Sequence, residues 1–173
     1  GLALQTFERL SARRPGLRMV VVGDGPMRAR LERAHPRARF VGMQTGQALA
    51  RHYASADVFL FPSLTETFGN VTLEALASGL AVAAFDTGAA GQHIRDGVSG
   101  CLAPPCEGLS TADAFLDAAT RALGSCEADG LLRMEARLAA CQADWDGVLR
   151  RFDQHLRLVA SAGGVATRYA AVA

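Results

Sequence analysis

Lysine is absent from the sequence: the 18 basic residues are all arginines, and 17 acidic residues leave a net charge of +1 at pH 7. Domains that bind nucleic acids carry a large basic excess to neutralise phosphates, so no polynucleotide partner is expected. The missing lysine also excludes a Walker P-loop, in which a lysine side chain contacts the nucleotide phosphates.

Paired cysteines and long apolar runs are missing as well. The four cysteines form no CxxC and have no histidine at ligand spacing, so neither a zinc site nor a disulfide framework is predicted. No apolar run approaches the length of a transmembrane helix, and no signal peptide opens the sequence. These absences favour a cytoplasmic location, and 173 residues with 50% hydrophobic composition suffice for one domain with a sizeable core.

The stretch 57–80 organises the rest of the sequence. An apolar run from Val58 to Phe61 predicts a buried strand, which ends at Pro62 because proline has no backbone donor. From Gly69 onward, apolar residues recur at helical spacing and predict a helix behind a polar loop that holds Glu66. Strand, loop and helix together are half of a βαβ unit.

The predicted loop and helix start combine features of a sugar-nucleotide site. The first turn of a helix has unpaired amide donors and partial positive charge, which suit a phosphate, and Gly69 lets backbone approach a ligand. Glu66 and Glu74 supply carboxylates that can accept hydrogen bonds from the hydroxyl pairs of a ribose or a hexose. For an isolated pair of glutamates, a simpler interpretation is that Glu66 caps loop amides and Glu74 lies on a solvated helix face.

This stretch resembles the donor-site motif of retaining GT-B glycosyltransferases, in which two glutamates are separated by seven residues. The match in register comprises Pro62, Ser63, Glu66, Phe68, Gly69, Glu74, Ala75, Ala77 and Gly79. The resemblance implies that Glu66 contacts the donor hexose and that Glu74 binds the ribose hydroxyls. It also implies that the backbone of Phe68, Gly69 and Asn70 contacts the sugar and the diphosphate.

Thr67 belongs to the same predicted donor loop, at a position where many members of the family carry glycine. The stretches Thr-Glu-Thr-Phe-Gly-Asn-Val-Thr-Leu-Glu and Phe-Asp-Thr-Gly-Ala-Ala are most similar to those of bacterial mannosyltransferase-like members.

Two earlier turns also match the family. Gly23-Asp24-Gly25-Pro26 follows an apolar run over 17–22, and a lone Gly-x-Gly most often marks a structural turn. In the family the matching loop lies near the nucleotide, which implies that role for Gly23 and Gly25.

A short strand is predicted over 39–42. In the family, the residues at the end of this strand contact the donor base largely through backbone, which implies that role for Val41, Gly42 and Met43. The alternative is that Met43 merely fills a gap in the core.

Apolar strands over 17–22, 58–61 and 80–85 alternate with helices over 2–14, 27–34 and 47–54. Right-handed crossovers then produce an α/β fold with a doubly wound parallel sheet and ligands at the carboxyl ends of the strands. The resemblance runs from about residue 2 to about residue 105 and implies the Rossmann-like half of a GT-B fold.

Helices are predicted for the remainder. One begins at Ser110 or Thr111 and ends at Gly124, and the last begins at Trp145. Between them, a helix has an apolar face formed by Leu131, Met134, Leu138 and Cys141. We expect a nucleotide-sugar-binding domain over 1–160 and a loosely ordered tail over 161–173.

The resemblance implies a parent enzyme that transfers a hexose from a GDP- or UDP-hexose to an acceptor with retention of anomeric configuration. No cofactor and no metal is predicted. The partners implied are the sugar-nucleotide donor and the N-terminal GT-B domain of the same chain, through which any contact with the inner face of a membrane would run. That domain, the first strand, and an arginine and a lysine near it would precede Gly1, so we expect the 173 residues alone to be inactive.

Three other interpretations compete with a glycosyltransferase domain. A non-catalytic Rossmann-like interaction module would have little reason to keep both Glu66 and Glu74. A nucleotide-sugar epimerase shares the GT-B architecture but differs around the glutamate motif. An NAD-binding Rossmann domain needs a third glycine, which the run Gly23-Asp24-Gly25-Pro26-Met27-Arg28 lacks.

Overall fold

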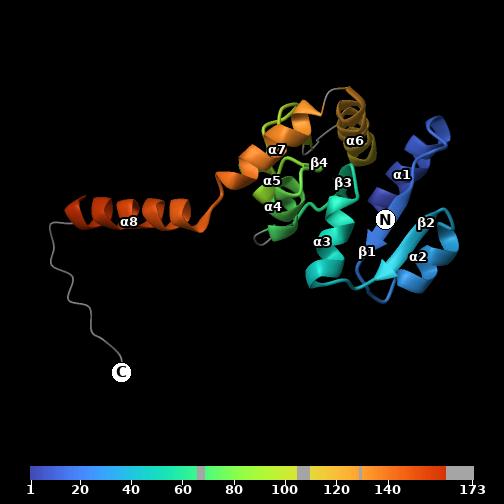
Figure 1. Ribbon diagram of the computed structural model, residues 1–173, viewed down its shortest axis with the longest axis horizontal. Coiled ribbons are helices and arrows are strands. Elements are labelled where there is room, and N and C mark those ends of the chain that lie inside the picture. The colour runs from blue at the N-terminus through green and yellow to red at the C-terminus, as the bar shows by residue number, and fades with distance from the viewer. Residues whose placement is uncertain (66–68, 105–109, 129, 163–173) are drawn as a thin grey trace. The chain divides into compact units, whose positions relative to one another are not determined.

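The computed structural model describes residues 1–65, 69–104, 110–128 and 130–162 (Figure 1). In chain order, the elements are α1 (Leu2–Arg13), β1 (Met19–Val22), α2 (Arg28–Ala34), β2 (Ala38–Gly42), α3 (Gly46–Ala54), β3 (Val58–Phe61), α4 (Asn70–Ala77), β4 (Ala81–Phe85), α5 (Gly88–His93), β5 (Cys101–Ala103), α6 (Thr111–Ala128), α7 (Leu131–Cys141) and α8 (Trp145–Ala162).

The chain divides into two compact units, Gly1–Cys141 and Gln142–Ala173. The predicted domain boundary at residue 160 stays a prediction, although α8 belongs to the second unit. Ser161 and Ala162 are part of α8, and the rest of the predicted tail, 163–173, lies outside the described residues.

All strand pairs in the described residues are parallel, which confirms the predicted α/β fold. One sheet contains β1 and β2, paired from Met19↔Ala38 to Val22↔Gly42 with a bulge before Val22. The other has the order β3-β4-β5, with Val58 opposite Ala81 and Ala83 opposite Cys101. Within the described residues, no hydrogen-bonded strand pair joins the two sheets.

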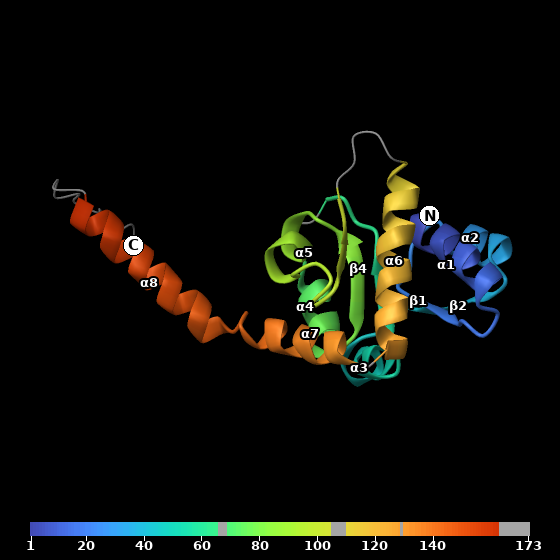
Figure 2. The ribbon, with the colours of Figure 1, turned by 90° about the horizontal axis from the view of Figure 1, so that it is seen from above.

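Helices cover both faces of β4, which is buried along its whole length. Ala81, Ala83 and Phe85 face the cluster that contains α6, whereas Val82 and Ala84 face the cluster that contains α4 and α5. Figure 2 shows the same layers, with α4 and α5 on one side of β4 and α6 on the other. This alternation follows from the period of two in a strand and confirms the doubly wound arrangement.

Small residues let α6 approach β4 closely. The face that α6 turns to the sheet carries four buried alanines and one large residue, Phe115. The ring of Phe115 lies 5.3 Å from the ring of Phe85, centroid to centroid. These two rings are the largest buried side chains in the cluster between helix and strand.

The predicted end of α6 at Gly124 was wrong, because the helix continues to Ala128. A glycine inside a helix costs only about 1 kcal/mol relative to alanine, which packing can outweigh. Cys126, beyond the glycine, packs against the core. Gly130 follows instead, with a φ of +72° that favours glycine.

The apolar face predicted for α7 does not lie in the core. Leu131, Met134 and Leu138 are exposed, and the buried residues of α7 are Leu132 and Ala136. Sequence spacing alone could not rank two apolar faces of one helix. The orientation of α7 follows from the hydrogen bonds of Arg133 and Arg137.

Arg133 holds α7 against the segment between α4 and β4 and the segment before β3. Its Nε donates to the Gly79 carbonyl at 2.8 Å, and its Nη1 donates to Asp57 Oδ1 at 2.9 Å. One turn later, Arg137 Nη2 donates to the Ser78 carbonyl at 3.4 Å. These bonds satisfy carbonyls at the C-terminal end of α4, which the helix itself leaves unpaired.

The turn before β5 depends on Asp96. Its Oδ1 accepts the Leu102 amide at 2.7 Å and Arg121 Nη1 at 2.8 Å. Burial would raise the pKa of Asp96, but the bonds from Arg121 and Leu102 outweigh it and lower this pKa below the ordinary 3.8. The carboxylate therefore links α6 to the start of β5.

Replacing Asp96 with asparagine should destabilise the chain by about 1 kcal/mol at neutral pH, since a charge-assisted hydrogen bond is lost. Because the folded-state pKa is lowered, the contribution of Asp96 is present above pH 3.8 and lost as the pH falls further. Urea unfolding at a series of pH values should show the two proteins converging in acid. Asp117→Asn, which removes a more exposed partner of Arg121 at 3.0 Å, is the control and should change stability by less than about 0.5 kcal/mol.

The predicted last helix is confirmed as α8, which is strongly amphipathic. Trp145, Phe152, Leu156 and Val159 recur on one face, and Arg157 pairs with Asp153 at 2.7 Å on another. No helix among the described residues is long and apolar enough to cross a membrane.

Candidate functional site

Three of the predicted donor-site residues, Glu66, Thr67 and Phe68, lie outside the described residues. Their predicted contacts with the sugar and the diphosphate therefore stay predictions. The residues on either side are described and define where the loop leaves β3 and enters α4.

The start of α4 has an open N-terminus. Gly69 precedes the helix in the left-handed region, with φ +74° and ψ 35°, and is buried. Among the described residues, no side chain caps this helix. Asn70, its first residue, is exposed. The sequence predicted a glycine here because backbone must approach a ligand closely. The positive φ of Gly69 is a second reason for glycine at this position, because it disfavours any residue with a Cβ.

Glu74 lies one turn into α4, and its side chain is exposed. Its Oε2 accepts a hydrogen bond of 3.1 Å from the Tyr53 hydroxyl, which comes from the end of α3. Burial, followed by the charge of Glu74, raises the pKa of Tyr53 to about 12. Tyr53 is therefore protonated and a donor at neutral pH.

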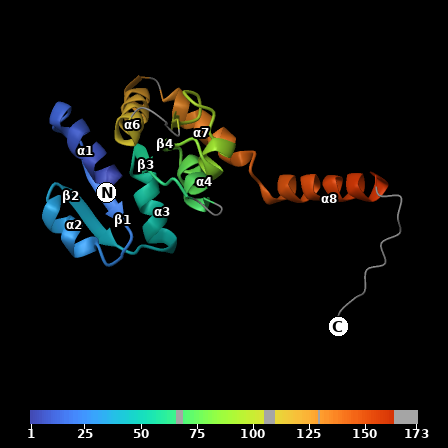
Figure 3. The same cartoon turned by 180° about the vertical axis from the view of Figure 1, so that it is seen from behind.

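Tyr53 was not predicted as a site residue. Its position beside Leu49 on the predicted helix over 47–54 indicated only an apolar face. Nothing in the sequence pairs residues 53 and 74, because their contact arises from the packing of α3 beside α4. Figures 1 and 3 show α3 next to α4, with β1 on its other side.

Two predicted nucleotide-binding segments meet at the carboxyl ends of β1 and β2. The Gly23 amide donates to the Gly42 carbonyl at 2.9 Å, so the turn after β1 is bonded to the end of β2. Gly42 has a φ of +72°, and a Cβ there would lie 2.7 Å from Arg28 Nη1. Gln44 Nε2 donates to the Val41 carbonyl at 2.7 Å, which orders the segment after the strand.

Met43 follows Gly42 and is 66% exposed, so the alternative that it fills a gap in the core was wrong. An exposed methionine at the end of a strand is free to contact a ligand. Its predicted contact with a base stays a prediction.

Asp24 makes the turn after β1 rigid. Its Oδ1 accepts the Gly25 amide at 2.8 Å, and its Oδ2 pairs with Arg28 Nη1 at 3.0 Å. The bond from the Gly25 amide and then that from Arg28 lower the pKa of Asp24. The turn is therefore fixed by its own side chains, and the Gly25 amide is not free to bind a ligand while Asp24 holds it.

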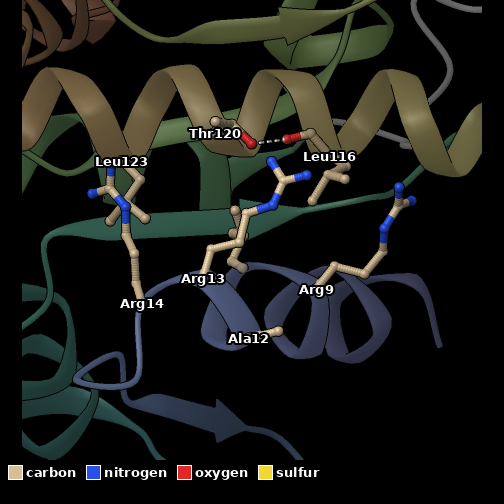
Figure 4. A pocket seen from close by; sticks show the side chains of 8 residues that line it. Arg9, Ala12, Arg13, Arg14, Leu116, Thr120 and Leu123 are labelled. Carbon is tan, nitrogen blue, oxygen red and sulfur yellow. Dashed lines mark hydrogen bonds between the residues drawn. The ribbon is translucent and has the colours of Figure 1, made fainter.

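A groove of about 390 Å³ lies elsewhere, between α1 and α6. Its lining includes Leu10, Leu116 and Leu123. Arg9, Arg13 and Arg14 extend toward α6 (Figure 4). Ion pairs of Arg9 with Asp113 and of Arg14 with Glu127 cross it. Because α6 and α4 cover opposite faces of the sheet, this groove is not part of the site around Glu74.

The model of the family described as glycosyl transferases group 1 matches residues 1–124. The chain belongs to this family. The match includes β1, β2, β3 and the start of α4, and so contains every predicted site residue.

Curated relatives agree with this assignment. The GDP-mannose-dependent alpha-mannosyltransferase of Mycobacterium tuberculosis is 49% identical over 88 residues, which are 51% of this chain and 23% of that protein. The D-inositol 3-phosphate glycosyltransferase of Nocardia farcinica is 37% identical over 145 residues, which are 76% of this chain and 31% of that protein. The chain thus spans less than a third of the length of these two relatives.

The fold is also that of solved glycosyltransferases. The crystal structure of the pneumococcal O-GlcNAc transferase in complex with UDP and GlcNAc superposes with a TM-score of 0.72. It covers 91% of this chain, which in turn covers 32% of that structure, at 21% identity. At this identity the likeness shows the fold, which is that predicted for half of a GT-B enzyme.

Proposed function

We propose that this chain is the donor-binding domain of a retaining glycosyltransferase, which transfers a hexose from a nucleoside diphosphate sugar to an acceptor. The observation that carries the proposal is the family match over 1–124, within which Glu74 stands exposed on the helix that follows β3. The mycobacterial relative is named as GDP-mannose-dependent, and the pneumococcal neighbour was solved with UDP. Both names support a GDP- or UDP-hexose as the donor.

The proposed roles follow the order of a sugar nucleotide. Val41, Gly42 and Met43 contact the base, and the turn at Gly23 and Gly25 lies near the nucleotide. Glu74 accepts the ribose hydroxyls. The backbone around Gly69 and Asn70, with Glu66, Thr67 and Phe68, binds the diphosphate and the hexose. No side chain of the described ranges caps the start of α4, which supports the diphosphate position, because amide donors and partial positive charge stabilise anions there.

The same donors would assist the reaction. When the bond from the hexose to the diphosphate breaks, negative charge develops on the departing phosphate oxygen. Amide donors fixed at that oxygen stabilise this charge more than they stabilise the intact donor, and so lower the barrier. The chain would thus hold the leaving group, while the acceptor binds to another domain.

The two separate sheets support the proposal that one more parallel strand belongs between them. β1 and β3 each pair with one strand, β2 and β4, among the described residues. A strand inserted between β1 and β3 would unite both sheets. Without that strand and the acceptor domain, we expect no sugar transfer by the 173 residues, and turnover by the purified chain would contradict this.

Nucleotide binding tests the proposed function directly. We expect GDP or UDP, at about 100 times its dissociation constant, to stabilise the chain by about 2.7 kcal/mol in thermal unfolding. Glu74→Ala should weaken binding about tenfold or more, since a charged acceptor of two hydroxyls is lost. Isothermal titration would measure the dissociation constants of both proteins.

Glu127→Ala is the matched control, because Glu127 is an exposed glutamate on α6, which covers the opposite face of the sheet. Its removal should leave nucleotide affinity unchanged. If GDP, UDP and ADP bind Glu74→Ala as tightly as the parent chain, the ribose is not held by Glu74 and the proposed site is misplaced.

A further inference from the structure

The hydrogen bond between Tyr53 and Glu74 is not needed to satisfy a buried charge. Glu74 is exposed, so water could solvate its carboxylate without a protein partner. Instead, the Tyr53 hydroxyl donates to Oε2 at 3.1 Å and ties one carboxylate oxygen to α3. What the bond changes is the direction in which the carboxylate points.

The ring that carries this hydroxyl is itself held in place. Tyr53 packs against Phe59 of β3 edge to face, with 5.9 Å between centroids and an angle of 62° between planes. Phe59 in turn stacks on Phe61, with 5.7 Å between centroids and an angle of 13°. A half-buried ring in such a row has little freedom to turn.

A free glutamate side chain on a helix surface samples several rotamers, because three torsions separate its carboxylate from the backbone. An ionised carboxylate has about four acceptor positions on two oxygens, and Tyr53 takes one of those on Oε2. No other hydrogen bond from the part of the chain that the structure describes reaches Oε1 or the second position on Oε2. Two neighbouring hydroxyls, as in a ribose, can use these two oxygens together.

We propose that Tyr53 is a positioning residue, which holds the Glu74 carboxylate in the orientation that accepts both ribose hydroxyls of the donor nucleotide. This inference rests on the proposed function, because it requires that Glu74 binds the ribose. Tyr53 acts through Glu74. It contributes to nucleotide affinity because the Glu74 carboxylate samples fewer orientations before binding, so less side-chain entropy is lost when the ribose binds.

The test compares Tyr53→Phe with the parent chain, using GDP and UDP and their 2′,3′-dideoxy counterparts as probes. Phenylalanine keeps the ring row with Phe59 and removes only the hydroxyl. We expect affinity for the better-bound ribonucleotide to fall about three- to tenfold, the effect of one lost hydrogen bond. Affinity for its dideoxy counterpart should not change.

A thermodynamic cycle with Glu74→Ala, which removes the acceptor of the Tyr53 hydrogen bond, completes the test. If Tyr53 acts through Glu74, adding Tyr53→Phe to Glu74→Ala should have a much smaller effect than in the parent chain. Equal losses for ribose and dideoxy nucleotides, or additive effects of the two substitutions, would show that Tyr53 only supports the fold, which overturns the inference.

The outcomes also separate the two proposals. If the parent chain binds ribonucleotides and Glu74→Ala weakens this binding while Tyr53→Phe does not, the proposed function stands and the role of Tyr53 is wrong. If Glu74→Ala has no effect on ribonucleotide affinity, the proposed ribose site is wrong and the inference is overturned with it.

Discussion

Replacing Phe115 with alanine should lower the free energy of unfolding by about 3–5 kcal/mol, the range for truncating a fully buried aromatic side chain. Phe115 is completely buried between α6 and β4, and its ring contacts the ring of Phe85 at 5.3 Å. Most of the other buried residues in this cluster are alanines, which have no rotamers with which to fill the cavity. Urea unfolding followed by circular dichroism would measure the loss.

Phe152→Ala is the matched control, because the same change is made on α8 at a side chain that is 60% exposed. It should change the free energy of unfolding by less than about 1 kcal/mol. Losses of similar size for both variants would contradict the assignment of Phe115 to the core.

Gly100→Val is expected to produce the second-largest loss of stability, about 2–3 kcal/mol. A Cβ at Gly100 would lie 2.8 Å from Ile94 Cγ2 and 3.0 Å from the Val82 carbonyl oxygen. The Ile94 side chain could turn away only into a packed cluster. The Val82 carbonyl cannot move aside, because it belongs to the backbone of the buried strand β4. The added methyl groups would therefore push β5 from β4. Thermal unfolding should show a lower melting temperature.

Gly124→Val provides the comparison for this prediction. Nothing lies within 4 Å of a Cβ at Gly124, and the residue is inside α6. Valine has the higher helix propensity, so this change should be neutral or stabilise the chain by a few tenths of a kcal/mol, roughly. A stabilising effect of Gly100→Val would show that β5 is less closely packed than described.

The fold could be predicted where hydrophobic pattern and turn chemistry agree. Val58–Phe61 was predicted with the bounds of β3, because an apolar run flanked by aspartate and proline permits few other structures. The end of α6 was missed, because packing of Cys126 outweighs the cost of Gly124. The buried face of α7 was missed because it depends on Arg133. This residue bonds to Gly79 and Asp57, which lie 54 and 76 positions earlier in the sequence.

The candidate site was predictable only in part, and for a related reason. Gly69 and Glu74 belong to one continuous motif, so their spacing carries information. Tyr53 enters the site from another helix, 21 positions before Glu74, and only the packed structure brings them together. The division of the described strands into two sheets likewise depends on pairing between distant segments.

The alanines between β4 and α6 also affect how the cost of folding is distributed. An alanine loses no rotamer entropy when it is buried, so ordering Ala81, Ala83 and the alanines of α6 costs little beyond the backbone. Each alanine, however, removes little apolar area from water. The gain from burial on this side of β4 is therefore concentrated in a few large side chains, among them Phe85, Phe115 and Leu132. This half of the core therefore loses little side-chain entropy on folding, and its stability depends strongly on those few large residues.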